Sequence, residues 1–302
     1  MKRYDCYYLF LWLLVLPEIS IAQVTPNEVY AQAFRINEEI NLFKRHLNLD
    51  ETISTQEIKA NISPHHVWQK TYEILFKLNI LREKHGLPVI AVSSLEPCKK
   101  IIPLYVYEQT QRILTELNLL KLILTIEGES DLPPQFANKV PADVFNLLNH
   151  VSYQIDLLNG TAFSPSVVFA QAMRISDDVD VILRTLEIKN TVIPPAKQEN
   201  ITLLDAFETT LHLLKEIQRV QALVGVEGIN WYAFKPNENI TPTEIFGMTG
   251  IILAELQILK AHFELKHALT PLAKHYENKV PSDVQRVLSW SVRKMKLIQS
   301  LR

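Results

Sequence analysis

Apolar residues recur along this chain at alternating steps of four and three, in eight segments of about 20 residues each. One such series starts at Val29 and continues through Ala33, Ile36, Ile40 and Phe43. Positions three and four apart lie on one face of an α helix, so the spacing predicts a single apolar stripe on each helix. Strand-like alternation is scarce and the chain has only 7 glycines. The pattern therefore predicts an all-α protein.

Each apolar series is preceded by residues that favour the start of a helix. Thr241 can cap the helix, Pro242 suits the first helical position, and Glu244 can accept a hydrogen bond from the Thr241 amide in a capping box. Ile240 and Ile245 are placed to form a hydrophobic staple. These roles explain the repeated segment without a ligand. The predicted starts are Thr25-Pro26, Ser63-Pro64, Pro103, Val140-Pro141, Ser164-Pro165, Ile201-Thr202, Thr241-Pro242 and Val280-Pro281.

The helix starts recur at a long, constant spacing. Pro26 and Pro165 are 139 residues apart, and the sequence Asn-Lys-Val-Pro occurs at 138–141 and again 140 residues later, at 278–281. Self-similarity at a fixed spacing indicates repeated structural units. We predict a tandem duplication of an antiparallel four-helix bundle, with eight helices in all. The alternative is a continuous α-solenoid of helical hairpins.

The first residues have the composition of a secretory signal peptide. Lys2 and Arg3 precede the apolar run 7–16, and small residues lead to a predicted cleavage site after Ala22. This predicts a periplasmic or secreted protein, the alternative being an inner-membrane anchor formed by an uncleaved signal. No later segment has about 18 unbroken apolar residues, so the mature chain is predicted not to span a membrane. The predicted organisation is a signal peptide (1–22), a first four-helix unit (23–160) and a second four-helix unit (164–302).

Charge and cysteine content narrow the possible partners and compartment. The formal net charge is −2 and the sequence pI is near 6.5, which gives no electrostatic basis for binding nucleic acid. Cys6 lies in the predicted signal, so Cys98 has no partner for an intramolecular disulfide. The lack of disulfides in an exported chain favours a bacterial periplasm. The expected partner is an unknown protein or small molecule.

Sequence signatures of cofactors and catalysis are missing. Covalent haem requires Cys-x-x-Cys-His, which is absent, and a di-iron bundle needs two Glu-x-x-His motifs, of which only 264–267 matches. There is no Gly-x-Ser-x-Gly and no phosphate-binding glycine loop. Gly247 and Gly250, inside one predicted helix, indicate a kink or a close approach of another helix. We predict no cofactor and favour a non-catalytic protein, and an enzyme or metal site between bundle helices is the alternative.

The predicted connections between helices are unusually long. They have about 14 residues, whereas bundle connections usually have two to eight, and long loops often carry function. The connection 228–234 is apolar where loops are normally polar. Its aromatic residues Trp231, Tyr232 and Phe234 are candidate anchors for a ligand or partner. The alternative is that this segment folds back and seals the side of a bundle.

Two polar residues are retained at equivalent positions in both predicted units. Gln32 and Arg35 in the first unit correspond to Gln171 and Arg174 in the second. They are candidate contacts for a ligand or partner, and the alternative is a solvated helix flank or a hydrogen bond between helices. The favoured hypothesis is a non-catalytic exported helical binding or interaction module, with a sensory role or a place in an envelope complex as its expected settings. A purely structural scaffold is the remaining alternative.

Overall fold

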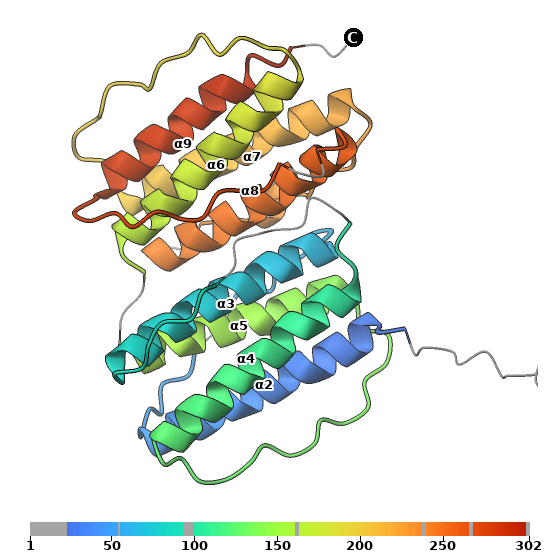
Figure 1. Cartoon of the computed structure of the whole chain (residues 1–302), viewed down its shortest axis with the longest axis vertical. Coiled ribbons are helices and arrows are strands. Elements are labelled where there is room, and N and C mark those ends of the chain that lie inside the picture. The colour runs from blue at the N-terminus through green and yellow to red at the C-terminus, as the bar shows by residue number, and fades with distance from the viewer. Residues whose placement is uncertain are drawn as a thin grey trace, which may run out of the picture.

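The chain forms eight α helices, one short 3₁₀ turn and no strand within the part that the computed structural model describes, which confirms the predicted all-α fold (Figure 1). The described residues are 23–53, 55–92, 100–160, 163–236, 240–265 and 268–299. The predicted signal peptide, Cys98 and His267 lie outside them. The helices are α2 (Pro26–His46), α3 (Pro64–Lys84), α4 (Pro103–Ile123), α5 (Pro141–Asn159), α6 (Pro165–Thr185), α7 (Leu203–Leu223), α8 (Pro242–His262) and α9 (Pro281–Met295), with η2 (Trp231–Ala233) between α7 and α8.

All eight helices begin where the sequence predicts. At α8, the Glu244 carboxylate accepts from the Thr241 amide at 2.8 Å, and the Thr241 hydroxyl accepts from the Thr243 amide at 3.2 Å. At α5 the capping residue is Val140, which has no side-chain acceptor. Only the returning bond forms there, from the Val140 amide to the Asp143 carboxylate at 2.9 Å. Capping bonds therefore form at six of the eight described helix starts, and α4 and α6 begin at a first-turn proline without a side-chain cap.

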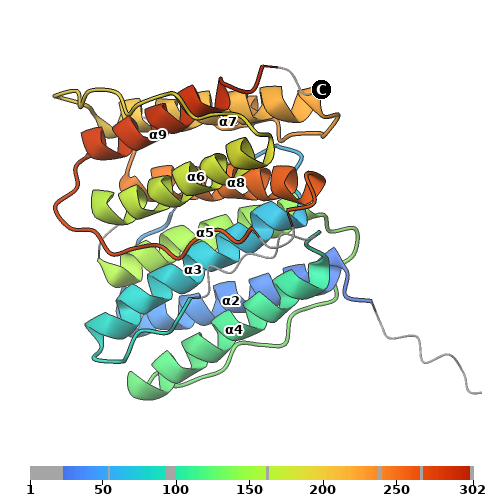
Figure 2. The same ribbon diagram turned by 45° about the horizontal axis from the view of Figure 1, so that its top comes forward.

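The helices form two groups of four. In the first group, α2 and α3 each pack against both α4 and α5; in the second, α6 and α7 each pack against both α8 and α9. The two groups stack on each other mainly through α3 and α8, and side chains of α5 and α6 also reach across the contact (Figure 2). Apolar stripes fill each group: Val29, Ala33, Ile36, Ile40 and Phe43 are all buried, as the spacing predicts.

Within each group the helices run parallel, so the predicted antiparallel arrangement is wrong. The first-turn prolines Pro26, Pro64, Pro103 and Pro141 all meet at one end of the first group, together with the valines three residues further on. Ion pairs show the same direction in the second group, where Lys294 near the end of α9 contacts Asp180 near the end of α6 at 2.6 Å. Because successive helices point the same way, the alternative of stacked helical hairpins does not describe either group.

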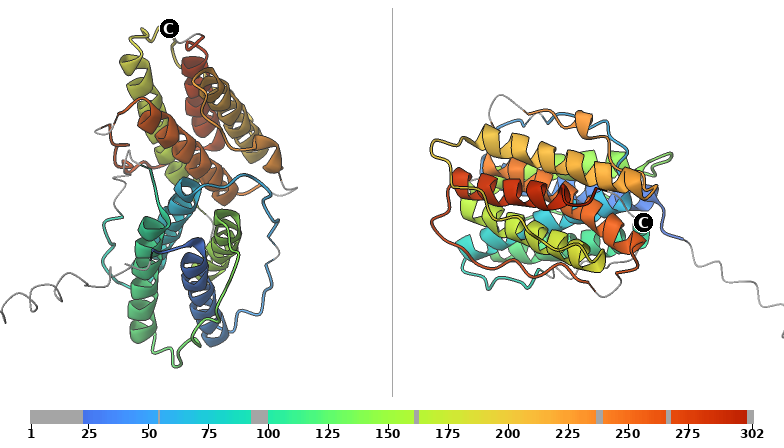
Figure 3. Two further views of the ribbon diagram at one scale, coloured as in Figure 1. Left: turned by 90° about the vertical axis from the view of Figure 1, so that its right-hand side faces the viewer. Right: turned by 90° about the horizontal axis from the view of Figure 1, so that it is seen from above.

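Connection length explains the parallel arrangement. A helix of 21 residues is about 31 Å long, and an extended chain covers about 3.3 Å per residue. A return to the starting end thus needs roughly ten residues, and the connection between α2 and α3, residues 47–63, has 17. These crossovers run along the outside of each group (Figure 3). The short connection is the one between α5 and α6, and there the direction of the helices reverses.

Buried ion pairs join neighbouring parallel helices and fix the crossovers. Lys260 on α8 lies 2.9 Å from Asp178 on α6, and both side chains are 0% exposed. The Lys260 ammonium also donates to the Ala268 carbonyl and the Thr270 hydroxyl, each at 3.0 Å, and Thr270 donates to Asp178 at 2.6 Å. The ion pair therefore satisfies its remaining hydrogen-bonding groups with the crossover to α9, as a buried charge requires.

The first group contains the corresponding arrangement. Lys121 on α4 lies 2.7 Å from Glu39 on α2, and the Ser130 hydroxyl of the crossover to α5 donates to Glu39 at 2.7 Å. Burial acts to raise the pKa of Glu39, but the hydrogen bonds from Lys121 and Ser130 hold it below its usual range. Both groups thus attach a crossover to an ion pair at the same level of the bundle.

Helix α8 is unusually apolar. It is the one described helix whose length and composition would allow it to cross a membrane, with a mean hydropathy of 1.2, and 72% of that apolar window is buried inside the protein. Its position explains the composition, because α8 packs against α6 and α7 on one side and against α3 on the other. A helix covered on several sides is apolar around most of its circumference.

Replacing Lys260 with methionine should lower the free energy of unfolding by about 3–5 kcal/mol, because Asp178 would remain buried without a cation. Adding Asp178→Asn should recover part of the loss, since asparagine carries no charge and can still accept from Thr270. Urea denaturation measures both values. The control is Lys59→Met, which removes the exposed Lys59–Glu57 pair and should cost less than about 1 kcal/mol. Equal losses for Lys260→Met and Lys59→Met would contradict the role assigned to Lys260.

Candidate ligand cavity between the two helix groups

The contact between the groups is an antiparallel helix pair. Near the start of α3, His66 Nε2 lies 2.7 Å from Glu255 near the end of α8. At the other end, the ring of Phe76 on α3 lies 5.9 Å from that of Phe246 on α8. Phe163, in the short link between the groups, packs between them with ring centroids 5.9 Å from Phe76 and 4.2 Å from Phe246. The link is thereby held in the contact.

Glycines in α8 allow the two helices to approach closely. A Cβ atom on Gly247 would lie 3.4 Å from Lys70 Nζ, and one on Gly250 would lie 3.7 Å from Gln69 Cβ. Longer side chains at these positions would separate the helices. Of the two readings of this glycine pair, a kink or a close approach, the structure supports the close approach.

A cavity of about 180 Å³ opens beside this contact. It is lined by α3 and α5 of the first group, by α7 and α8 of the second, and by the crossovers that follow α2 and α7. Gln56 and Lys235, one from each crossover, are exposed and mark its mouth. Its apolar lining comes mainly from buried Phe145, Phe207, Phe234, Met248 and Ile251.

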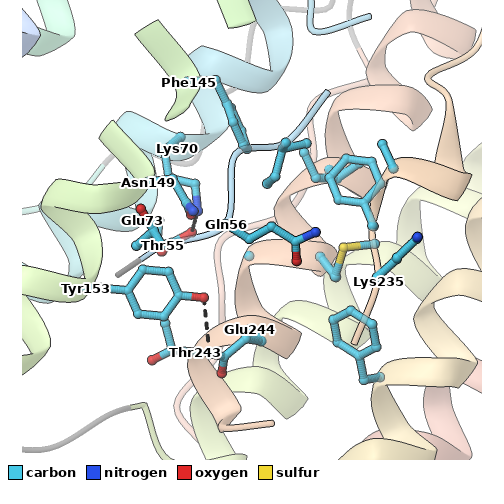
Figure 4. Close-up of a pocket in the computed structure, with 17 residues that line it drawn as sticks. Thr55, Gln56, Lys70, Glu73, Phe145, Asn149, Tyr153, Lys235, Thr243 and Glu244 are labelled. Carbon is cyan, nitrogen blue, oxygen red and sulfur yellow. Dashed lines mark hydrogen bonds and ion pairs between the residues drawn. The ribbon is translucent and has the colours of Figure 1, made fainter. Parts of the chain in front are cut away.

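Most of the polar lining, from Lys70 to Tyr153, lies on one side of the cavity together with Phe145 (Figure 4). Lys70 Nζ donates to Glu73 at 2.7 Å and to Asn149 at 3.1 Å. The Ser152 hydroxyl donates to the second oxygen of Glu73. Lys77, 3.8 Å from Glu73 and 2.8 Å from Asp156, continues this network behind the cavity wall. These side chains are held in place by one another rather than by solvent.

Charge pairing decides the protonation of this network. Burial acts to raise the pKa of Glu73, but Lys70 and Lys77 hold it below its usual range. Burial lowers the pKa of Lys77, against the attraction of Glu73 and Asp156. For Asp156 burial prevails over Lys77 and raises the pKa. Glu73 is therefore the carboxylate whose ionised form the folded protein favours most clearly here.

In the polar lining, one hydrogen bond joins the two helix groups: Tyr153 comes from the first group and Glu244 from the second. The Tyr153 hydroxyl on α5 donates to Glu244 Oε1 on α8 at 3.1 Å (Figure 4). Burial and the neighbouring Glu244 carboxylate raise the pKa of Tyr153, so it is a neutral donor. The other oxygen of Glu244 accepts from the Thr241 amide. The same carboxylate thus caps α8 and faces the cavity.

A second polar cluster has the residue types of a catalytic triad but lacks its geometry. Ser63 Oγ lies 2.9 Å from His66 Nδ1, and His66 Nε2 lies 2.7 Å from Glu255. However, the Ser63 backbone amide also donates to Nδ1 at 2.9 Å, and that nitrogen has a single lone pair. His66 therefore takes the place of the acid in a capping box, and Nε2–H donates to Glu255. It has no free base with which to activate Ser63.

The three aromatic candidates in the crossover before α8, Trp231, Tyr232 and Phe234, lie in different environments. Phe234 is 7% exposed and lines the cavity. Trp231 stacks on Tyr232 with a centroid distance of 3.9 Å, and Tyr232 is 70% exposed at the surface. Ile229 in the same crossover is buried, so this segment also seals the side of its helix group. Only Phe234 of the three aromatics lines the cavity.

The repeated polar candidates lie away from the cavity. Arg174 is 1% exposed, donates to Gln171 at 2.5 Å and to the Pro271 carbonyl at 2.9 Å, and stands 5.2 Å from the centre of the Tyr72 ring. It thus attaches the crossover before α9 and contacts the first group. Gln32 and Arg35 are half-buried on α2. None of these four residues lines the cavity.

Sequence reasoning missed the polar lining of the cavity, namely Lys70, Glu73, Asn149, Tyr153 and Glu244. The capping role of Glu244 can be predicted from the sequence, but its place in the cavity lining cannot. The signal that could have found them was α8 itself, because a helix apolar around most of its circumference must be covered by a second group. Together with Gly247 and Gly250, it indicates where another helix approaches.

Known proteins give no independent assignment of this site. No family model matches the chain, no curated protein matches it, and no solved structure matches it. Among the described residues, no group of three or more histidine, cysteine, aspartate and glutamate side chains is placed to hold a metal ion. The function must therefore be argued from the cavity and its chemistry.

The pKa of Glu73 predicts a pH-dependent contribution to stability. Its folded-state pKa is lowered, so its stabilisation is present above the unfolded-state pKa of about 4.3 and is lost as the pH falls through the folded-state value. Glu73→Gln should therefore be destabilising at pH 7, and the gap to the wild type should close as the pH falls below about 4. Urea denaturation between pH 7 and 3 measures the gap. A gap that stays constant would contradict the assignment.

Proposed function

We propose that this protein is a non-catalytic, exported helical binding module, with its ligand site in the cavity between the two helix groups. The observation that carries the proposal is the composition of that cavity, which combines three phenylalanines, a methionine and an isoleucine with a network of hydrogen-bonded polar side chains. Ligand sites combine apolar walls with a few fixed polar groups in this way, and they occur preferentially between structural units.

The size of the cavity limits the ligand. An apolar cavity of about 150 Å³ is large enough to hold benzene, and this one measures about 180 Å³. A molecule with one ring, or a branched aliphatic group of similar volume, fits the apolar side. Its polar end would meet Lys70, Asn149, Tyr153 and Glu244, which the network of hydrogen bonds holds in fixed positions.

We infer that the chain arose by tandem duplication of a four-helix unit, and the proposed site requires two such units side by side. Helix starts in the two groups are 139 residues apart for three helix pairs and 140 for the fourth. The cavity needs both groups, because Tyr153 comes from the first and Glu244 from the second. A single four-helix group would lack one wall. This supports a binding role over a purely structural scaffold.

The stacked pair of exposed Tyr232 and half-buried Trp231 supports a second mode of interaction. Tyr232 is 70% exposed and stacks on Trp231, and exposed aromatics are common anchors for protein partners. This pair could contact a protein, in an envelope complex or a sensory assembly, without obstructing the cavity. Replacing Trp231 and Tyr232 with alanine should then lower partner recovery in pull-downs while leaving ligand binding in the cavity unchanged.

Cavity binding can be tested with three probes of one size and different charge: 2-phenylethylamine, 2-phenylethanol and phenylacetate. At least one should bind the wild type with one saturable site in calorimetric titration. Ala233→Trp should abolish this binding, because Ala233 lines the cavity and the indole would fill it. The control is Ala222→Trp on the exposed side of α7, which should bind like the wild type. If Ala233→Trp binds normally, or no probe binds, the cavity is not the site.

Export is the remaining part of the proposal, and its support is the composition of residues 1–22. Expressed in a bacterium with an outer membrane, the chain should be recovered from the periplasm with Gln23 as its first residue. N-terminal sequencing of the periplasmic fraction measures this. Recovery in the inner membrane with residues 1–22 retained would favour the anchored alternative, and a cytoplasmic product would contradict export.

A further inference from the structure

Lys235 is exposed at the mouth of the cavity, and inside that mouth the charged lining residues are paired except for Glu244. Lys70 pairs with Glu73 at 2.7 Å, and Lys77 pairs with Asp156 at 2.8 Å, so the polar network behind the wall is neutral as a whole. Glu244 makes no ion pair with any described residue, although it accepts hydrogen bonds from Tyr153 and Thr241. The site therefore contains a carboxylate without a cation.

From this imbalance we propose that the ligand is a small primary amine with one aromatic or branched apolar group. The inference rests on the proposed function and specifies the ligand of the same cavity. An ammonium group has three donors, and a carboxylate can accept about four hydrogen bonds. Glu244 uses part of that capacity in the folded protein, so it can still accept from a ligand.

The surroundings of Glu244 favour a cation further. The Tyr153 oxygen donates its hydrogen to Glu244 and keeps its lone pairs for another donor. The Tyr153 ring lines the same wall, and aromatic rings attract ammonium groups. An ammonium placed between them would be paired with a carboxylate and partly desolvated, which is where such contacts are strongest.

The opposite wall accommodates the rest of the molecule. Phe207, Phe234 and Met248 are between 4% and 7% exposed and offer apolar surface to the cavity. A ligand carboxylate would instead have to find a cation, and Lys70 is already bonded to Glu73 and Asn149. Lys235 is at the exposed mouth, where water screens its charge. An acid is thus less well accommodated than an amine.

The test compares two matched substitutions. Glu244→Gln removes the charge but keeps the helix start, because glutamine also serves at this position of a capping box. Glu28→Gln makes the same change at the equivalent cap of α2, where Glu28 accepts from the Thr25 amide at 2.8 Å and does not line the cavity. Each protein is titrated calorimetrically with 2-phenylethylamine, 2-phenylethanol and phenylacetate.

For the wild type we expect 2-phenylethylamine to bind most tightly of the three. Glu244→Gln should weaken that binding about tenfold or more and leave 2-phenylethanol unchanged, and Glu28→Gln should change neither. If 2-phenylethanol or phenylacetate binds at least as tightly as the amine, and Ala233→Trp abolishes that binding, the amine assignment is overturned while the cavity remains the site. If no probe gives binding that Ala233→Trp removes, both the ligand class and the proposed function are overturned.

Discussion

Parallel alignment of four helices is the constraint on which the rest of this structure depends. Aligned helices place their positive ends together at one end of a group and their negative ends at the other, and charges near the ends offset this. The acids Glu28, Asp143, Asp205, Glu244 and Asp283 occupy first turns, and basic residues occupy the last turns of most helices. The alignment also requires an extended crossover after each helix. Buried pairs such as Lys260–Asp178 fix these crossovers against the helices, and stacking the two groups in opposite directions opposes their dipoles.

Local capping chemistry allows the helices to be predicted from the sequence, but it does not predict the direction in which each helix runs. A capping box such as Thr241–Glu244 specifies where a helix starts, but it carries no information about the neighbour against which the helix packs. The connections did contain that information. Segments such as 47–63 are too long for hairpins and long enough to return along a helix, although their length also makes them candidate functional loops. In the structure they are mainly return paths, and the segments after α2 and before α8 also line the cavity.

The candidate site could not be predicted because its polar residues look like solvent-facing helix positions. Lys70, Glu73 and Lys77 flank the apolar stripe of α3, where solvated side chains are expected, and each is at most 5% exposed because it bonds to α5 beside the contact with α8. Their burial results from packing between helices and leaves no pattern in the neighbouring sequence. The pair Gln171 and Arg174, predicted as a candidate ligand contact, bonds within itself and to a crossover, and Arg174 also contacts the neighbouring group. Such bonding between elements is the alternative that the sequence left open for these two residues.

The contact between α3 and α8 joins helices that are not equivalent, since α3 corresponds to α7 and α8 to α4 by their position in each group. In such a head-to-tail contact, the equivalent of the α3 surface recurs on α7 and the equivalent of the α8 surface recurs on α4, both on the outer sides of the molecule. The symmetry of the contact alone therefore does not limit it to two units. The side chains at the equivalent positions differ. The position 139 residues before Gly247 is the exposed acid Glu108 on α4, and the position 139 residues after Gln69 is the exposed acid Glu208 on α7. The outer surfaces of the two groups thus carry exposed acids where the inner contact has glycine and glutamine, so the equivalent helices differ in the residues with which they could pack.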